Sequence, residues 1–107
     1  MSREWTNGNL DALLLGVLHE QPAHGYEVIQ RLRNASDGEF DLPEGSVYPS
    51  LHRMEKAGAV RSSWDTVGGR RRRVYEITPA GASTLRSARR SWSRYSFSVN
   101  AVLGLST

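Results

Sequence analysis

Apolar residues in the first third of the chain recur at helical spacing. Residues 9–20 carry one apolar stripe, which Pro22 terminates because the residue before a proline avoids the helical region. A second amphipathic helix is expected from about residue 24 to Ala35. Residues 1–8 are polar and predict a loose arm that Trp5 anchors.

A third helical segment begins near Gly45 and ends near Gly58. Pro49 is expected close to its first turn, because proline cannot donate a backbone hydrogen bond. One face of this helix is apolar and predicts a core contact. The opposite face carries Pro49, His52, Arg53 and Lys56. The side chains near the N-terminal end belong to Ser46, Tyr48, Pro49 and Ser50.

In the second half of the chain, the spacing of apolar residues changes from helical to alternating. From Val60 to Asp65 apolar and polar residues alternate, which is typical of a strand. Residues 66–69 predict a hairpin turn, and residues 70–77 a return strand. The Thr-Pro pair at residues 78 and 79 then predicts a capped helix over residues 79–103.

This order of elements predicts a mainly α fold with a β-hairpin, a winged helix-turn-helix over residues 1–78. The C-terminal helix, within residues 79–107, outreaches so small a core and predicts packing on a second copy, a homodimer. Packing back on its own domain is the alternative. The expected dimer seam has spacings of three and four residues. It consists of Leu85, Ala88, Trp92, Tyr95, Val99 and Val102.

Composition narrows the function further. The net charge of +3 comes with acidic residues concentrated in the first half of the chain and basic residues in the second, which suggests a local patch for a polyanion. The absence of cysteine excludes thiolate metal sites and thiol catalysis. His19, His24 and His52 are too scattered to predict a metal site, and no cofactor is expected. With neither a nucleophile turn nor a membrane-spanning stretch, the sequence predicts a cytoplasmic protein that is not an enzyme.

The third helix and the hairpin suit double-stranded DNA. In this architecture the third helix enters the major groove, and arginines at a wing tip reach the adjacent backbone or minor groove. A solubilising edge strand is the alternative for the arginine run. The expected DNA-binding residues are Gly45, Ser46, Tyr48, Pro49, Ser50, Arg53, Lys56, Gly69, Arg70, Arg71 and Arg72.

Several segments resemble the PadR-like transcriptional regulators, in their short subtype with a single C-terminal helix. They are LLLGVL at 13–18, HGYEVIQRL at 24–32, LPEGSVYPSLHRMEKAGAV at 42–60, GGRRRRVYEITPAG at 68–81 and NAVL at 100–103. The resemblance implies a winged helix that dimerises through its C-terminal helices. It also implies repression at dyad-symmetric operators, with release of DNA on binding a small effector.

Trp92 and Tyr95 are the candidate effector-binding residues. Two Trp92 rings facing each other across a dimer would form a hydrophobic slot for a planar aromatic molecule. Plain dimer packing explains the same residues. The alternative function is therefore a small-molecule or metal sensor in which this slot dominates and DNA contact is secondary. A protein-interaction module that has lost DNA binding is a third class.

Overall fold

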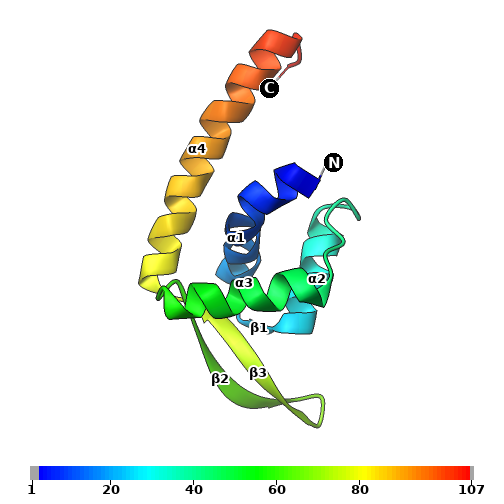
Figure 1. Cartoon of the computed structure of the whole chain (residues 1–107), viewed down its shortest axis with the longest axis vertical. Coiled ribbons are helices and arrows are strands. Elements are labelled where there is room, and N and C mark those ends of the chain that lie inside the picture. Colours follow the sequence, from blue (N-terminus) through cyan, green and yellow to red (C-terminus); the bar gives the residue numbers. More distant parts are fainter. Residues whose placement is uncertain (1–2, 107) are drawn as a thin grey trace.

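The computed structural model describes residues 3–106, with side chains from residue 9 onward. Four helices and a small antiparallel sheet make up this part of the chain (Figure 1). The elements are α1 (Arg3–Glu20), β1 (Ala23–His24), α2 (Gly25–Ala35), α3 (Glu44–Lys56), β2 (Val60–Val67), β3 (Arg70–Ile77) and α4 (Pro79–Leu103). The predicted winged helix-turn-helix with one long C-terminal helix is confirmed.

The first helix is longer than the sequence suggested. The expected arm over residues 1–8 is wrong from Arg3 onward, because α1 begins there. No proline interrupts residues 3–8, and Gly8 costs only about 1 kcal/mol in a helix interior. Helix formation therefore continues through this segment. The Trp5 side chain lies outside the described side chains.

The core forms where α1, α2 and α3 meet the sheet and the first turns of α4. The most deeply buried side chains are Leu14, Leu15, Leu18, Val28, Val47, Leu51, Val60 and Tyr75. The predicted apolar face of α3 is confirmed, since Val47 and Leu51 are fully buried and Met54 is nearly so. The core thus holds α3 by one face and leaves the other to solvent.

The sheet has the strand order β1-β3-β2, with both pairs antiparallel. The sequence did not predict β1, because a two-residue strand shows no period. The hairpin turn is also shorter than expected, since β2 runs on to Val67. Only Gly68 and Gly69 form the turn, with φ of +61° and +77°. Two consecutive positive φ angles match the twist of the flanking strands and favour glycine.

The remaining helix boundaries follow local chemistry. Nδ1 of His24 accepts a hydrogen bond from the Glu27 amide at 3.2 Å and caps α2. The predicted Thr78 cap of α4 is confirmed, because its hydroxyl accepts from the Gly81 amide at 3.1 Å. Pro49 is the sixth residue of α3, counted from Glu44, and so lies in the second turn, directly after the first. This placement leaves the carbonyl of residue 45 without its usual i+4 donor.

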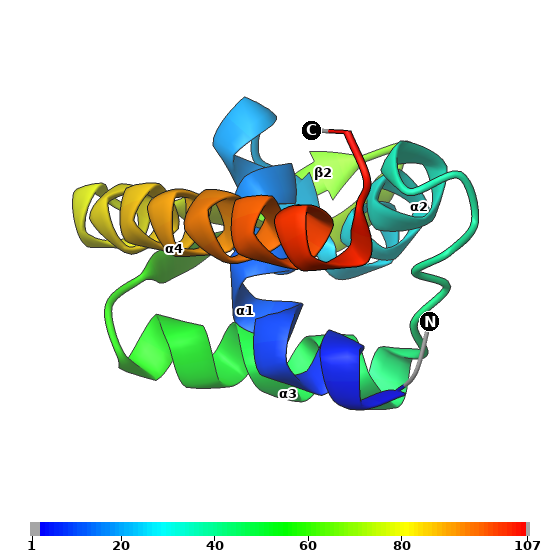
Figure 2. The same ribbon diagram turned by 90° about the horizontal axis from the view of Figure 1, so that it is seen from above.

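The long helix leaves the core after its first turns. Its C-terminal half rises beyond α1, while the hairpin extends from the opposite end of the molecule (Figure 1). Seen from above, α1 runs between α4 and α3 (Figure 2). The exposed face of α3 and the free half of α4 are therefore separate surfaces.

Candidate nucleic-acid interface

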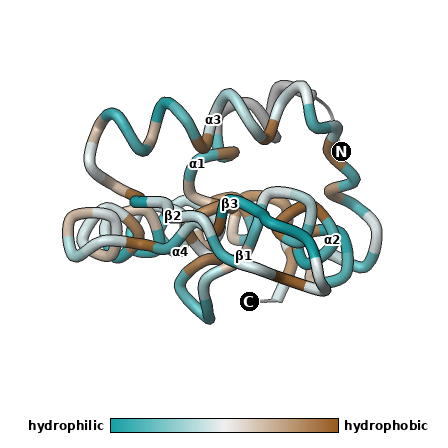
Figure 3. Tube along the Cα trace, turned by 90° about the horizontal axis from the view of Figure 1, so that it is seen from below, coloured by the Kyte–Doolittle hydropathy of each residue, from teal (hydrophilic) through white to brown (hydrophobic). Residues whose placement is uncertain are grey.

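The polar face of α3 is exposed as its helical period predicts. Pro49, His52, Arg53 and Lys56 are all exposed, and so is Gly45 at the N-terminal end. The hairpin runs beneath α3, and its hydrophilic strand β3 is visible from below (Figure 3). Two polar elements from distant parts of the sequence thus share one side of the molecule.

Ser50 does not belong to this surface. Its side chain is buried, with 3% of its surface exposed, and its hydroxyl donates to the Ser46 carbonyl at 3.0 Å. The prediction of Ser50 as a DNA contact is therefore wrong. The helical period places residue 50 beside the buried positions 47 and 54, which the sequence reading overlooked.

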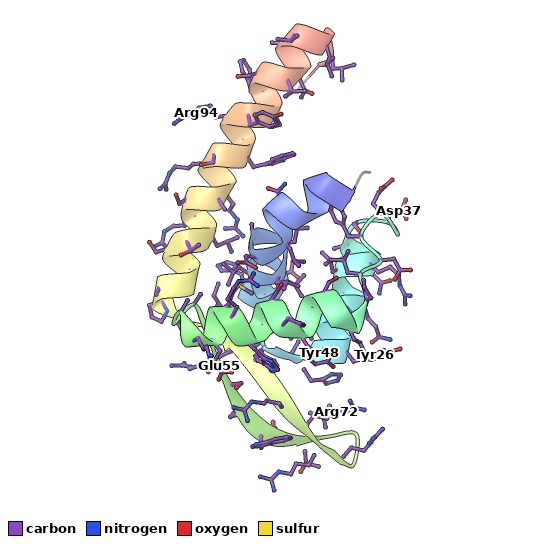
Figure 4. The ribbon with its side chains drawn as sticks, in the orientation of Figure 1. Tyr26, Asp37, Tyr48, Glu55, Arg72 and Arg94 are labelled. Atoms are coloured by element: carbon purple, nitrogen blue, oxygen red, sulfur yellow. The ribbon has the colours of Figure 1, made fainter. Side chains whose placement is uncertain are left out.

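Tyr48 is half-buried between α2 and the hairpin. Its ring lies against Gly25, the first residue of α2. Burial raises the pKa of the Tyr48 phenol, Glu44 raises it further, and Arg72 on β3 partly opposes them. Figure 4 shows Tyr48 above Arg72, on the hairpin side of α3. Tyr48 therefore packs α3 against the start of α2, on the side of α3 that faces the wing.

Arg53 forms an ion pair with a residue that is far away in the sequence. Its Nη2 atom lies 2.5 Å from Oδ1 of Asp11 on α1, and both side chains are about half exposed. Asp11 lies 42 residues earlier in the sequence, and no local sequence pattern predicts this pair. The contact fixes one edge of the Arg53 guanidinium and leaves its other donors available.

The wing carries an aromatic platform. The Trp64 ring is about half exposed, and the guanidinium carbons of Arg71 and Arg73 lie 5.3 and 5.5 Å from its centroid. Register explains the cluster, because Trp64 faces Arg73 across the strands and Arg71 is two residues away on the same face. Arg73 also donates to the Ser62 hydroxyl at 2.8 Å.

The residue-by-residue reading missed Trp64 and Arg73. The alternation of both strands, combined with the Gly-Gly turn, fixes the register that brings them together. Arg72 is on the other face, directly opposite Asp65. The arginine run is therefore divided between two faces of the hairpin.

The exposed part of α4 forms a second apolar surface. Trp92 and Tyr95 are each about half exposed, with ring centroids 5.8 Å apart, and Val102 is 87% exposed. Leu85 differs, because it is buried in the protomer core. Its assignment to the free seam is wrong, since the first turns of α4 still pack on the domain.

A pocket opens between α1 and α4, with a volume of about 260 Å³. It is lined by Asn9, Ala12, Leu13, Phe40, Leu85, Ala88, Arg89 and Trp92. Of the two predicted effector residues, Trp92 lines this pocket and Tyr95 does not. The lining is mostly apolar, with polar groups at Asn9 and Arg89.

Two classes of feature are absent from the described residues. Among side chains 9–106, no group of three or more histidines, aspartates and glutamates is arranged to hold a metal ion. Within residues 3–106, no helix is long and apolar enough to cross a membrane.

Similar proteins agree with this geometry. Residues 14–87 match the sequence model of the transcriptional regulator PadR-like family. The transcriptional regulator Rv3488 of Mycobacterium tuberculosis is 39% identical over 83 residues, which are 75% of each chain.

Solved structures are similar over most of the chain. A transcriptional regulator from Clostridium thermocellum superimposes with a TM-score of 0.85 at 27% identity, covering 94% of this chain and 96% of the other. A PadR-like regulator from Bacillus cereus gives 0.83 at 29% identity, with the same coverage. This protein therefore belongs to the PadR-like family of transcriptional regulators.

Proposed function

We propose that the protein is a sequence-specific DNA-binding repressor that acts as a homodimer. One observation carries the proposal. Helix α3 and the β2–β3 hairpin lie at one end of the protomer, away from the free end of α4 (Figure 1), and Tyr48 of α3 lies above Arg72 of the hairpin (Figure 4). A duplex can therefore meet both elements while α4 remains available to a second copy.

In this proposal the N-terminal half of α3 enters the major groove. Gly45 is exposed with open space around it, so a base pair can approach the backbone there. Ser46 and Pro49 border the same approach. Arg53 and Lys56 lie further along the helix, where they suit phosphates at the edge of the groove.

The wing contacts the adjacent backbone or minor groove in the same arrangement. Gly69 allows close approach at the tip, and Arg70, Arg71 and Arg72 supply the charge. The Trp64 ring holds Arg71 in place before DNA arrives. This preorganisation lowers the entropy lost on binding.

The seam of α4 supports dimerisation. Excluding the buried Leu85, it comprises Ala88, Trp92, Tyr95, Val99 and Val102. A helix of 25 residues with half-exposed aromatic rings offers more apolar surface than its own domain covers. A twofold axis through these helices would place the two α3 helices on half-sites about one helical turn apart. A dimer on such an operator would exclude polymerase and repress transcription.

The pocket between α1 and α4 favours regulation by a small effector. Its apolar lining suits a planar aromatic molecule, and Trp92 lies on both the pocket and the seam. A ligand there would change the angle between protomers and so the spacing of the recognition helices. The sensor alternative, with DNA contact secondary, rests on this same pocket.

Footprinting tests the proposal. The intact protein is bound to a duplex containing the region upstream of its own gene, and the protected bases are mapped. We expect two protected half-sites about 10 base pairs apart, centre to centre. The variant Arg53→Ala/Lys56→Ala should lose protection while remaining folded. Protection of one isolated half-site would contradict the dimer. If no upstream or randomly selected duplex were protected, DNA binding itself would be contradicted.

A further inference from the structure

The outer face of α4 carries an arginine strip that the proposed function leaves unused. It consists of Arg86, Arg90 and Arg94, with Arg89 at its edge toward the α1–α4 pocket, and all four are exposed. Among side chains 9–106, none of these four arginines forms an ion pair. The sequence has no aspartate or glutamate after Glu76. The strip is therefore a positive surface without a counter-charge on its own helix.

This strip lies away from the seam. At 3.6 residues per turn, Arg90 and Arg94 are each about 200° around the helix from Trp92. Figure 4 shows Arg94 pointing away from the rest of the protomer. A shallow hollow beside the strip is lined by Arg89, Arg90, Ser93, Arg94 and Phe97. A partner helix seated on Trp92 would leave this face exposed.

The complementary surface lies on the opposite side of the same protomer. The segment between α2 and the start of α3 carries four exposed carboxylates. They belong to Asp37, Glu39, Asp41 and Glu44. Among the described side chains, Asp41 forms a long ion pair of 3.7 Å with Arg33, in which both side chains are about half exposed or more. Asp37 is at the exposed tip, on the far side of the molecule from Arg94 (Figure 4).

We propose that the arginine strip docks the acidic segment, residues 37–44, of a neighbouring copy of the chain. The two surfaces carry opposite charges and face outward on opposite sides. If a second copy is displaced along the direction of α3, the arginine strip of one copy faces the acidic segment of the other. Such a head-to-tail contact does not close on itself. The inference rests on the proposed DNA-binding dimer, because the contact would join dimers bound side by side on one duplex.

The DNA itself fits the strip less well. Arg94 is 15 residues after Pro79, about 22 Å along α4, and the duplex is expected at the opposite end of the protomer. Phe97, 64% exposed, borders the same hollow. A phosphate backbone offers no apolar partner for that ring, whereas Pro43 in the acidic segment is exposed. Protein is therefore the better occupant.

Charge reversal tests the contact. Arg90→Glu/Arg94→Glu changes the strip, Asp37→Arg/Asp41→Arg changes the acidic segment, and the fourfold variant exchanges both. Binding is measured on DNA with one operator and with two adjacent operators. We expect wild-type dimers to bind the second operator about tenfold more tightly than the first, since several weak exposed pairs act together. Either double variant alone should abolish this gain in affinity for the second operator. The fourfold variant, in which the charges of the two surfaces are exchanged, should restore it.

Two results would overturn the inference. One is cooperativity that is absent in the wild type or unchanged by either reversal. The other is a loss of affinity for the single operator in the strip variant, which would assign the strip to DNA. Sedimentation velocity without DNA provides a separate arm. The wild type should form species larger than the dimer at low salt, and each reversal should remove them. If the protein bound no DNA, sedimentation velocity would still show whether the arginine strip and the acidic segment bind each other.

Discussion

The ring of Tyr48 lies over Gly25 so closely that a Cβ atom at position 25 would stand 2.3 Å from its Cε1 atom. Gly25 begins α2, and Tyr48 is on α3. The absence of a side chain at residue 25 therefore lets the ring fill the angle between the two helices. This contact sets how α3 is presented on the surface.

Gly25→Ala tests that relationship. The added methyl group must displace the Tyr48 ring, and overpacking of this kind costs about 1–3 kcal/mol. We expect urea unfolding to show this loss together with weaker operator binding. Gly16→Ala is the matched control, because nothing lies within 4 Å of a Cβ there and alanine favours the α1 helix. Equal stability of the two variants would contradict the account.

The wing arginines should act through phosphates. Arg70→Ala and Arg72→Ala should each reduce the slope of log Kd against log salt by about 1 and weaken binding to all sequences alike. Arg61→Ala provides the control, since Arg61 is on the same hairpin but is paired with Glu76 at 2.6 Å. A slope unchanged by the wing variants would exclude them from the DNA contact.

Substitutions in the C-terminal and N-terminal parts of α4 should affect dimerisation and folding separately. Val102→Asp places a charge on a side chain that is 87% exposed in the protomer, so it should dissociate the dimer without lowering protomer stability. Leu85→Ala removes a buried core side chain and should cost about 2–5 kcal/mol of unfolding free energy. Sedimentation equilibrium and urea unfolding measure the two effects. A Val102→Asp variant that stayed fully dimeric would refute the seam.

Alkaline pH should destabilise the fold through Tyr75. Burial raises the pKa of its phenol above 10.0, Glu55 adds to this, and Arg73 partly opposes it. As the pH rises through 10, the unfolded chain releases this proton first, so the stability present below pH 10 is progressively lost. Tyr75→Phe should flatten that decline in urea unfolding between about pH 9 and pH 11. Tyr26→Phe, at an exposed tyrosine, is the control, and an identical decline in both variants would contradict the assignment.

The sequence predicted what depends on local period and end signals. The apolar faces of α2 and α3, the Thr78 cap and the bounds of α4 all follow from residues within a few positions of one another. Contacts across the chain were not predictable in this way. Asp11 reaches Arg53 only after α1 and α3 pack, and Trp64 meets Arg73 only once the strand register is fixed.

Two of the errors concern side chains that the core covers. Ser50 shares the helical face of the buried positions 47 and 54, so the period of α3 already placed it inside. Leu85 is in the first turns of α4, and the period of that helix does not show how far along it the protomer core extends.

Binding of the intact protein to operator DNA across a salt series tests the central claim most directly. A matched duplex with the half-sites scrambled is titrated in parallel. We predict a specific complex whose affinity falls steeply with salt, with a slope that corresponds to several neutralised phosphates, and weaker binding to the scrambled duplex. Negligible binding to both duplexes at low salt would contradict the DNA-binding account and leave the Trp92 pocket as the functional surface.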